Sequence, residues 1–208
     1  MHKNIKSIFF ILFISLFVGC NSGEPDNRNV KDAIVDDLGE KFMFENPPEK
    51  VISLAPSLTE MIYELDAEEA LNGNTTFCNY PPEADAITKV GDLLTVDYEK
   101  ILQLKPDLIL ISVEGNRKSV YDKLKELGLK VFVSNPRNYT GIKKSFTDLS
   151  RIFGKDKKAE NIITVWDSTV ISIRNKSDTI SNESIMFLVD LQPVYVAGSN
   201  TFIDELIN

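Results

Sequence analysis

Short apolar runs recur along the middle of the chain, and each is separated from the next by a segment with helical periodicity. The runs are three or four residues long and end at turn residues, as is typical of buried strands in a parallel sheet. Strands that alternate with amphipathic helices indicate an α/β fold whose sheet is covered on both faces. In such sheets, ligands bind outside the carboxyl ends of the strands. The strands are predicted over residues 51–54, 71–74, 108–111 and 131–133.

Helix signals lie between these strands. Ser57-Leu58-Thr59-Glu60 has the spacing of a capping box, in which Ser57 would cap a helix that runs to about Leu65. Gly128 and Gly154 stand where two later helices would end. The helices are predicted over residues 58–65, 97–104, 118–127 and 142–153.

The pattern changes at both ends of this α/β region. Asp36-Asp37-Leu38-Gly39 is a turn between two short apolar stretches, which predicts a hairpin over 34–44. Residues 156–173 form one long helical pattern, about 27 Å in length at ~1.5 Å per residue. A polar linker (175–182), a strand (185–189) and the start of a helix (202–207) follow it. One strand and part of a helix do not bury a core, so we expect a fragment that lacks most of a second lobe.

The first twenty residues have the features of a lipoprotein leader. Lys3 and Lys6 precede an apolar run over 8–18, which is too short to span a hydrocarbon core of about 30 Å. Leu16-Phe17-Val18-Gly19-Cys20 resembles a bacterial lipobox, in which the cysteine is acylated and becomes the mature N-terminus. We expect a signal peptide over 1–19, a lipid anchor on Cys20, a tether over 20–33 and an extracytoplasmic location, in the periplasm or at the cell surface. The alternative is a plain signal peptide, with Cys20 paired to Cys78.

Composition narrows the classes of function. The chain has 31 acidic and 23 basic residues and a net charge of −8, so nucleic acid is not an expected partner. Its one histidine, His2, lies in the predicted leader, which argues against a Ser-His-Asp triad or a histidine-bound metal. The sequence contains no G-x-S-x-G, G-x-G-x-x-G or P-loop motif. We therefore expect no enzyme, no catalytic residue, no metal site and no cofactor.

A series of motifs follows in order along the chain: Lys50–Glu60, Phe77–Ala84, Val90–Asp92, Tyr98–Leu102, Leu104–Leu110 and Leu127–Val131. Together they resemble the periplasmic binding proteins with a rigid helical backbone, which are the substrate-binding components of ABC importers for vitamin B12, iron–siderophores and haem. The resemblance implies a two-lobe α/β fold, with parallel-sheet lobes joined by one long helix and the ligand in the cleft between them. It divides the chain into a first lobe (34–155), a bridging helix (156–175) and the start of a second lobe (176–208).

The same resemblance implies a lipid-anchored, monomeric solute receptor that binds cobalamin or a related corrinoid and delivers it to a permease dimer. The alternative within the family is an iron–siderophore or haem receptor, so the ligand itself could be a metal chelate. The alternative from a different class is a secreted lipoprotein hydrolase. Glu99 falls where the family has an acidic residue that docks onto arginines of the permease. Asp97 is the alternative residue for this role. Glu99 could instead be an ordinary exposed glutamate of a helix.

Loops at the strand ends supply the candidate ligand-binding residues. Phe77 falls where the vitamin B12 receptors place a cleft aromatic, whereas Leu93 and Ser112 match positions at which those receptors have tryptophans. Phe77 could instead belong to the core of the lobe, and Tyr80 could pack on the prolines that follow it. Glu114 and Arg137 could be solvated loop charges. The ligand-binding candidates are Ser57, Phe77, Tyr80, Leu93, Ser112, Glu114 and Arg137.

Overall fold

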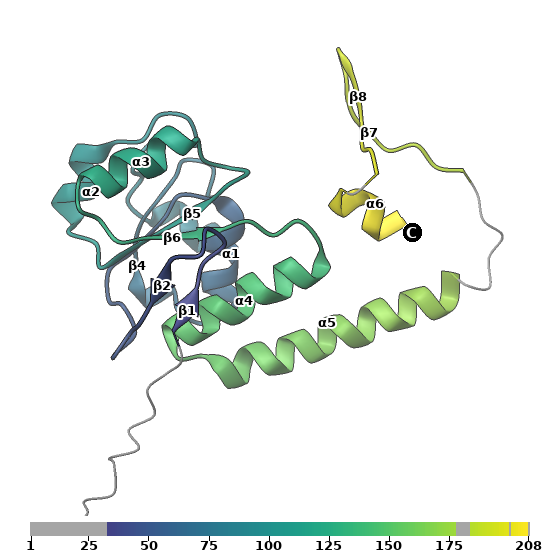
Figure 1. Ribbon diagram of the computed structural model, residues 1–208, viewed down its shortest axis with the longest axis horizontal. Coiled ribbons are helices and arrows are strands. Elements are labelled where there is room, and N and C mark those ends of the chain that lie inside the picture. Colours follow the sequence, from purple (N-terminus) through teal and green to yellow (C-terminus); the bar gives the residue numbers. More distant parts are fainter. Residues whose placement is uncertain (1–32, 178–183, 200, 208) are drawn as a thin grey trace, which may run out of the picture. The chain divides into compact units, whose positions relative to one another are not determined.

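The computed structural model of the chain describes residues 33–177, 184–199 and 201–207 (Figure 1). The predicted signal peptide, Cys20 and nearly all of the predicted tether lie outside these ranges, as does most of the predicted polar linker. Among the described residues, no helix is both long enough and apolar enough to cross a membrane.

A four-stranded parallel sheet forms the centre of the structure and confirms the predicted α/β class. Its strands lie in the order β4-β3-β5-β6, so the chain builds first to one side of β3 and then to the other. The order of the strands therefore reverses between β3 and β5. The strands are β3 (Val51–Ser53), β4 (Leu71–Asn74), β5 (Leu108–Ser112) and β6 (Val131–Ser134).

Helices cover both faces of this sheet (Figure 1). Because side chains on a strand alternate, Leu108 and Leu110 of β5 pack in one hydrophobic cluster, with α1 and α4. Ile109 and Ile111 pack in the other, with α2 and α3. Nearly continuous apolar strands are thus explained by burial on both sides. The helices are α1 (Pro56–Glu64), α2 (Tyr98–Leu104), α3 (Lys118–Glu126) and α4 (Tyr139–Phe153), with short 3-10 turns η1 (Glu68–Ala70) and η2 (Pro82–Ala86).

Two predicted helix starts are wrong. The α1 helix begins at Pro56 with Ala55 as its N-cap, so Ser57 lies inside the first turn and caps nothing. Proline suits the first helical position, because its missing N–H needs no partner there. The α4 helix begins at Tyr139, three residues before the predicted start, because the side chain of Asn138 caps it by accepting from the N–H of Gly141 at 2.7 Å.

The predicted hairpin is confirmed, and one buried carboxylate holds it to the sheet. Strands β1 (Ile34–Val35) and β2 (Lys41–Phe42) are antiparallel. Asp36 accepts from the backbone N–H groups of Leu38 at 2.9 Å and Glu40 at 2.8 Å, which shapes the turn. Its other oxygen accepts from the N–H of Val133 on β6 at 3.2 Å. The hairpin is therefore an extension of the lobe.

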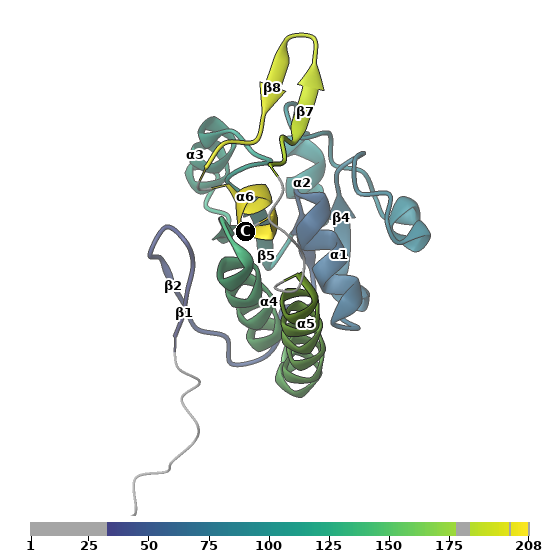
Figure 2. The same ribbon diagram turned by 90° about the vertical axis from the view of Figure 1, so that its right-hand side faces the viewer.

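The long helix α5 (Asp156–Ser177) runs beside α4 and extends four residues past its predicted end (Figure 2). The rings of Phe146 and Trp166 lie 4.8 Å apart between the two helices. Asp167 accepts from the Tyr139 hydroxyl at 2.9 Å and from Lys143 at 2.6 Å. Burial and this hydrogen bond raise the pKa of Tyr139 to about 12, and the hydrogen bonds from Lys143 and Tyr139 lower the pKa of Asp167.

A second small sheet lies after the long helix. Strands β7 (Leu188–Leu191) and β8 (Val194–Val196) form an antiparallel pair, followed by α6 (Phe202–Ile207). The helix was predicted correctly, but the strand begins three residues later than predicted and has a partner. The reason is that the uninterrupted apolar run over 185–189 does not reveal where a hairpin register begins. The division into lobes stays a prediction.

Candidate functional site

The loops after β3 and β5 meet at the point where the strand order reverses, which is the usual ligand crevice of an open α/β sheet. Asn116 joins them: its side-chain amide donates to the carbonyl of Leu54 at 3.1 Å and accepts from the N–H of Ser112 at 3.0 Å. A Cβ placed on Gly115 would lie 3.7 Å from both Ala55 and Leu93. Three chain segments therefore come together at this edge.

Four of the candidate residues lie along this edge. Leu93 is half-buried beside Gly115, and Ser57 follows the loop in the first turn of α1. Glu114 and Arg137 form a salt bridge of 3.5 Å between the loops after β5 and β6, with both side chains well exposed. Ser112 is only 7% exposed, so its hydroxyl offers little surface to a ligand.

Phe77 and Tyr80 project from the loop after β4. Phe77 is 55% exposed and Tyr80 is 65% exposed, so the alternative of Phe77 as a core residue is wrong. Cys78 between them is a buried free thiol, 3.2 Å from the Thr75 hydroxyl, and it fixes the loop with both rings outward.

Ser57 and Tyr80 border one hollow of about 360 Å³. Trp166 of α5 also lines this hollow. The sequence pattern predicted that Trp166 lies on the long helix, but not that it contributes to a site. Its participation depends on the packing of α5 against α4 through Phe146, which no local pattern encodes. The one local signal was that Trp166 is the only tryptophan of the chain. The hollow is lined by Ser57, Glu60, Met61, Glu64, Tyr80, Phe146 and Trp166.

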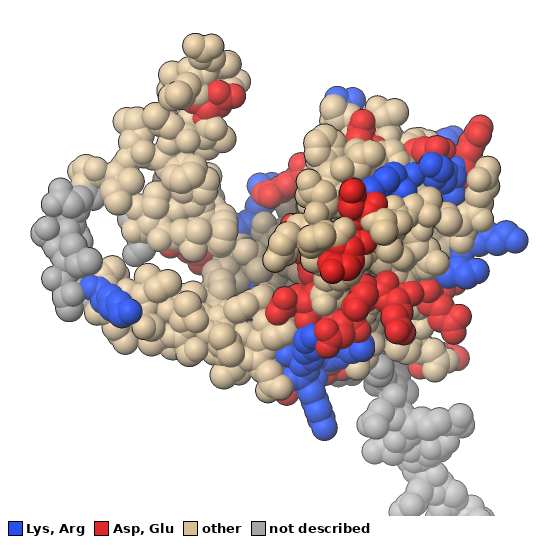
Figure 3. Space-filling view, turned by 180° about the vertical axis from the view of Figure 1, so that it is seen from behind, with Lys and Arg blue, Asp and Glu red and all other residues tan. Residues whose placement is uncertain are grey.

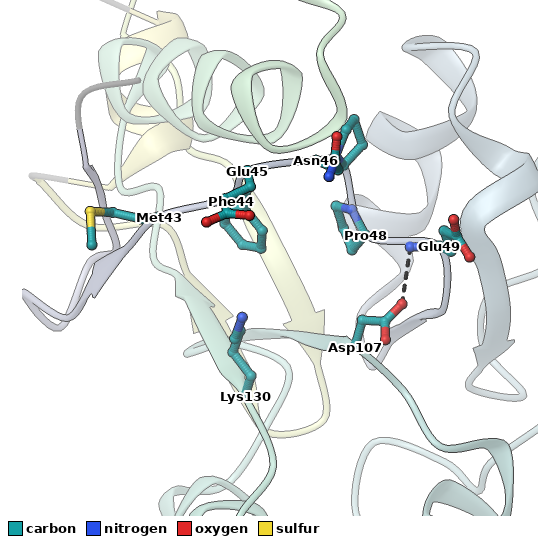
Figure 4. Close-up of a pocket in the computed structure, with 9 residues that line it drawn as sticks. Met43, Phe44, Glu45, Asn46, Pro48, Glu49, Asp107 and Lys130 are labelled. Carbon is teal, nitrogen blue, oxygen red and sulfur yellow. Dashed lines mark hydrogen bonds between the residues drawn. The ribbon is translucent and has the colours of Figure 1, made fainter. Parts of the chain in front are cut away.

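A second hollow, of about 330 Å³, lies at the opposite end of the strands (Figure 4). Asp107, which precedes β5, accepts there from the backbone N–H groups of Glu49 at 3.0 Å and Lys50 at 2.9 Å. The ammonium group of Lys130 lies 5.2 Å from the centre of the Phe44 ring. These groups already have partners within the lobe. Across the described ranges, no group of three His, Cys, Asp or Glu side chains is placed to hold a metal ion.

Glu99 and Asp97 have different surroundings at the start of α2. Asp97 is the N-cap, and its carboxylate accepts from the N–H of Lys100 at 2.9 Å. Glu99 lies in the first turn and is exposed. In the part of the chain that the structure describes, its carboxylate has no hydrogen bond or salt bridge. Glu99 is therefore free to meet a partner, whereas Asp97 is occupied by its own helix.

A parallel-sheet lobe with its loops gathered at the strand-order reversal, continued by one long helix, is the arrangement expected of one lobe of a two-lobe binding protein. Comparison with known families agrees: the model of the periplasmic binding proteins matches residues 51–208, and the chain belongs to this family. The family is one of binding proteins, which argues against the alternative of a secreted hydrolase.

Individual relatives of the chain are also named as binding proteins. An uncharacterised ABC transporter substrate-binding lipoprotein of Bacillus subtilis, YvrC, is 32% identical over 90% of this chain and 62% of its own length. A vitamin B12-binding protein of Pectobacterium carotovorum is 27% identical over 77% of this chain and 59% of its own. The chain thus spans about 60% of the length of these relatives.

Solved structures share the fold. The vitamin B12-binding protein BtuF of Vibrio cholerae superposes with a TM-score of 0.68 at 25% identity, over 76% of this chain and 62% of that one. A protein from Staphylococcus epidermidis, described as possibly iron-binding, gives 0.67 at 25% identity, over 77% and 64%. The predicted two-lobe binding-protein family is therefore confirmed for the part of the fold that the chain covers.

Proposed function

We propose that this protein is the substrate-binding component of an ABC importer and that it binds cobalamin or a related corrinoid at the carboxyl edge of its sheet. The observation that carries the proposal is the hollow that Ser57, Tyr80 and Trp166 share, which begins at this edge and extends along α1 to Glu64. The similarity to a substrate-binding lipoprotein over 90% of the chain supports the general role. The similarity to vitamin B12-binding proteins supports the ligand class.

The chemistry of the edge suits a large planar ligand. Such a ligand is held mainly by burial of apolar area, worth about 25 cal/mol per Å². Tyr80 and Trp166 line the hollow, and Phe77 offers a third exposed ring on the same loop as Tyr80. Glu114 and Arg137 stand at the next loops and offer polar contacts to groups at the rim of the ligand. Ser57 offers a hydroxyl at the first turn of α1.

Haem or an iron–siderophore is the second candidate ligand. The similarity to the possible iron-binding protein of Staphylococcus epidermidis favours it. A porphyrin would use the same ring surfaces, so the two candidates differ chiefly in the groups around the edge of the macrocycle.

Titration calorimetry with cyanocobalamin, haem and a ferric siderophore tests the ligand class. We expect the corrinoid to bind most tightly and to quench the fluorescence of Trp166, because the ring would enter the hollow that this side chain lines. Tyr80→Ala should weaken binding about tenfold through lost ring contact. Met43→Ala, which removes another exposed apolar side chain at the opposite end of the strands, should leave it unchanged. Failure of all three compounds to bind would contradict the proposed ligand class.

A further part of the proposal concerns the anchor. Cys20 would carry acyl chains that hold the protein on the outer side of a membrane, with the permease as its partner. In the producing cell, Cys20→Ala should abolish incorporation of labelled fatty acid and move the protein from the membrane fraction to an uncleaved or soluble form. Cys78→Ala is the matched control, because that thiol is buried in the lobe. Unchanged labelling of the Cys20→Ala variant would contradict this assignment.

A further inference from the structure

Two glutamates face the same hollow as Tyr80 and Trp166. Glu60 and Glu64 are four residues apart on α1, so their side chains are neighbours on one face of the helix. Among the residues that the structure describes, neither carboxylate has a hydrogen bond or a salt bridge. The hollow therefore presents two negative charges beside two aromatic rings.

Two basic side chains of the bordering helices are engaged with other acids. Lys143 pairs with Asp167, and Lys158 pairs with Asp66. Like charges at this spacing on a helix are mildly destabilising, which gives the pair no evident role in folding. The two glutamates are thus available to act on whatever enters the hollow.

The wider surroundings of α1 are also acidic. Asp and Glu side chains gather in the middle of the lobe in the view of Figure 3. Burial, followed by the charges of Glu68 and Glu83, raises the pKa of Tyr63 on α1. The carboxylates of Glu68 and Glu83 thus lie close enough to α1 to act on a side chain of that helix.

We infer that Glu60 and Glu64 are specificity determinants of the ligand site, which disfavour ligands whose periphery carries carboxylates. The inference rests on the proposed function. The rings of Tyr80 and Trp166 bind the flat part of a macrocycle whatever its periphery carries, so discrimination comes from charged side chains, of which Glu60 and Glu64 line the hollow itself. Amide side chains, such as those of a cobamide, meet the carboxylates as hydrogen-bond donors. Carboxylates, such as the propionates of haem, meet them as like charges.

The expected size of this discrimination follows from Coulomb's law. Both glutamates are exposed, so water screens them and the effective dielectric constant is closer to that of water than to that of a protein interior. Two such charges a few ångströms from a ligand carboxylate weaken its binding roughly tenfold.

Matched ligand pairs test this directly. Cobinamide and cobyrinic acid share the corrin ring, but their side chains end in amides and in carboxylates respectively. Haem dimethyl ester and haem share the porphyrin in the same way. Calorimetry with the whole protein should show which of the two pairs binds. Within that pair, the uncharged compound should bind about tenfold more tightly than the one that carries carboxylates. In the double variant Glu60→Gln/Glu64→Gln, this gap should fall below about threefold.

Glu45→Gln/Glu49→Gln is the control, because it makes the same change of charge at the same spacing in the hollow at the opposite end of the strands. It should keep the tenfold gap. Raising the salt concentration from about 0.05 M to about 0.5 M should narrow the gap in the unmodified protein, which provides a readout that needs no variant. Equal binding of the two members, or a gap that survives both treatments, would overturn the inference and leave the proposed function standing. Binding of none of the four compounds would overturn both.

Discussion

Replacing Asp36 with alanine should lower the free energy of unfolding by about 3 kcal/mol. The side chain is 4% exposed and accepts three backbone hydrogen bonds, from Leu38, Glu40 and Val133. Alanine would leave these N–H groups without this partner, and the hydrogen bond of Val133 is the buried one of the three, where an orphaned donor costs about 1–3 kcal/mol. The hairpin would be held less firmly to β6, where the N–H of Asp37 still donates to the carbonyl of Val133 at 3.0 Å. Phe42, whose ring centre lies 5.2 Å from that of Phe132, would lose part of its cover.

Urea unfolding followed by circular dichroism measures the change in the free energy of unfolding. In thermal unfolding, the melting temperature should fall by about 6–12 °C. Asp122→Ala is the matched control, since it removes an aspartate that forms only an exposed salt bridge with Lys118. Its effect should stay below about 0.5 kcal/mol. Equal effects of the two substitutions would show that the hairpin adds little to the stability of the lobe.

The strands and most helices of the lobe could be predicted because their signals are local. Leu108–Ile111 is apolar throughout, since both faces of β5 are buried, and Gly154 ends α4 in a left-handed conformation that suits glycine. The wrong helix start at Ser57 came from a competing local signal. The capping-box spacing fits the sequence, but Pro56 already occupies the first helical position, and only the backbone shows this.

The candidate site was predictable to a different degree. That loops at the carboxyl ends of the strands would gather at one edge followed from the expected parallel sheet, and Asn116 and Gly115 now show how closely they meet. The contribution of α5 was not predictable, because Trp166 reaches the hollow only through packing between helices distant in sequence. Neither was the burial of Ser112, which depends on where the strand ends.

Glu99→Arg should reduce transport at least tenfold while ligand affinity stays within about twofold. Glu99 is exposed in the first turn of α2, and its neighbour Asp97 is already engaged as the N-cap of the same helix. If Glu99 docks onto basic residues of the permease, arginine at this position would replace an attraction by a repulsion. Such a change slows association and destabilises the docked complex, yet it lies outside the hollow that Ser57, Tyr80 and Trp166 line.

The measurement is uptake of labelled corrinoid in the producing cell, with calorimetric titration of the purified variant beside it. Glu126→Arg is the matched control, because it reverses the charge of another exposed helical glutamate, 68% exposed and paired only with Lys123. It should leave both transport and affinity unchanged. Loss of transport with Glu99→Arg but not with Glu126→Arg would place the docking surface at the start of α2. Full transport by the Glu99→Arg variant would remove Glu99 from that role. Asp97 could take the role only if its carboxylate gave up the hydrogen bond from Lys100 that caps α2.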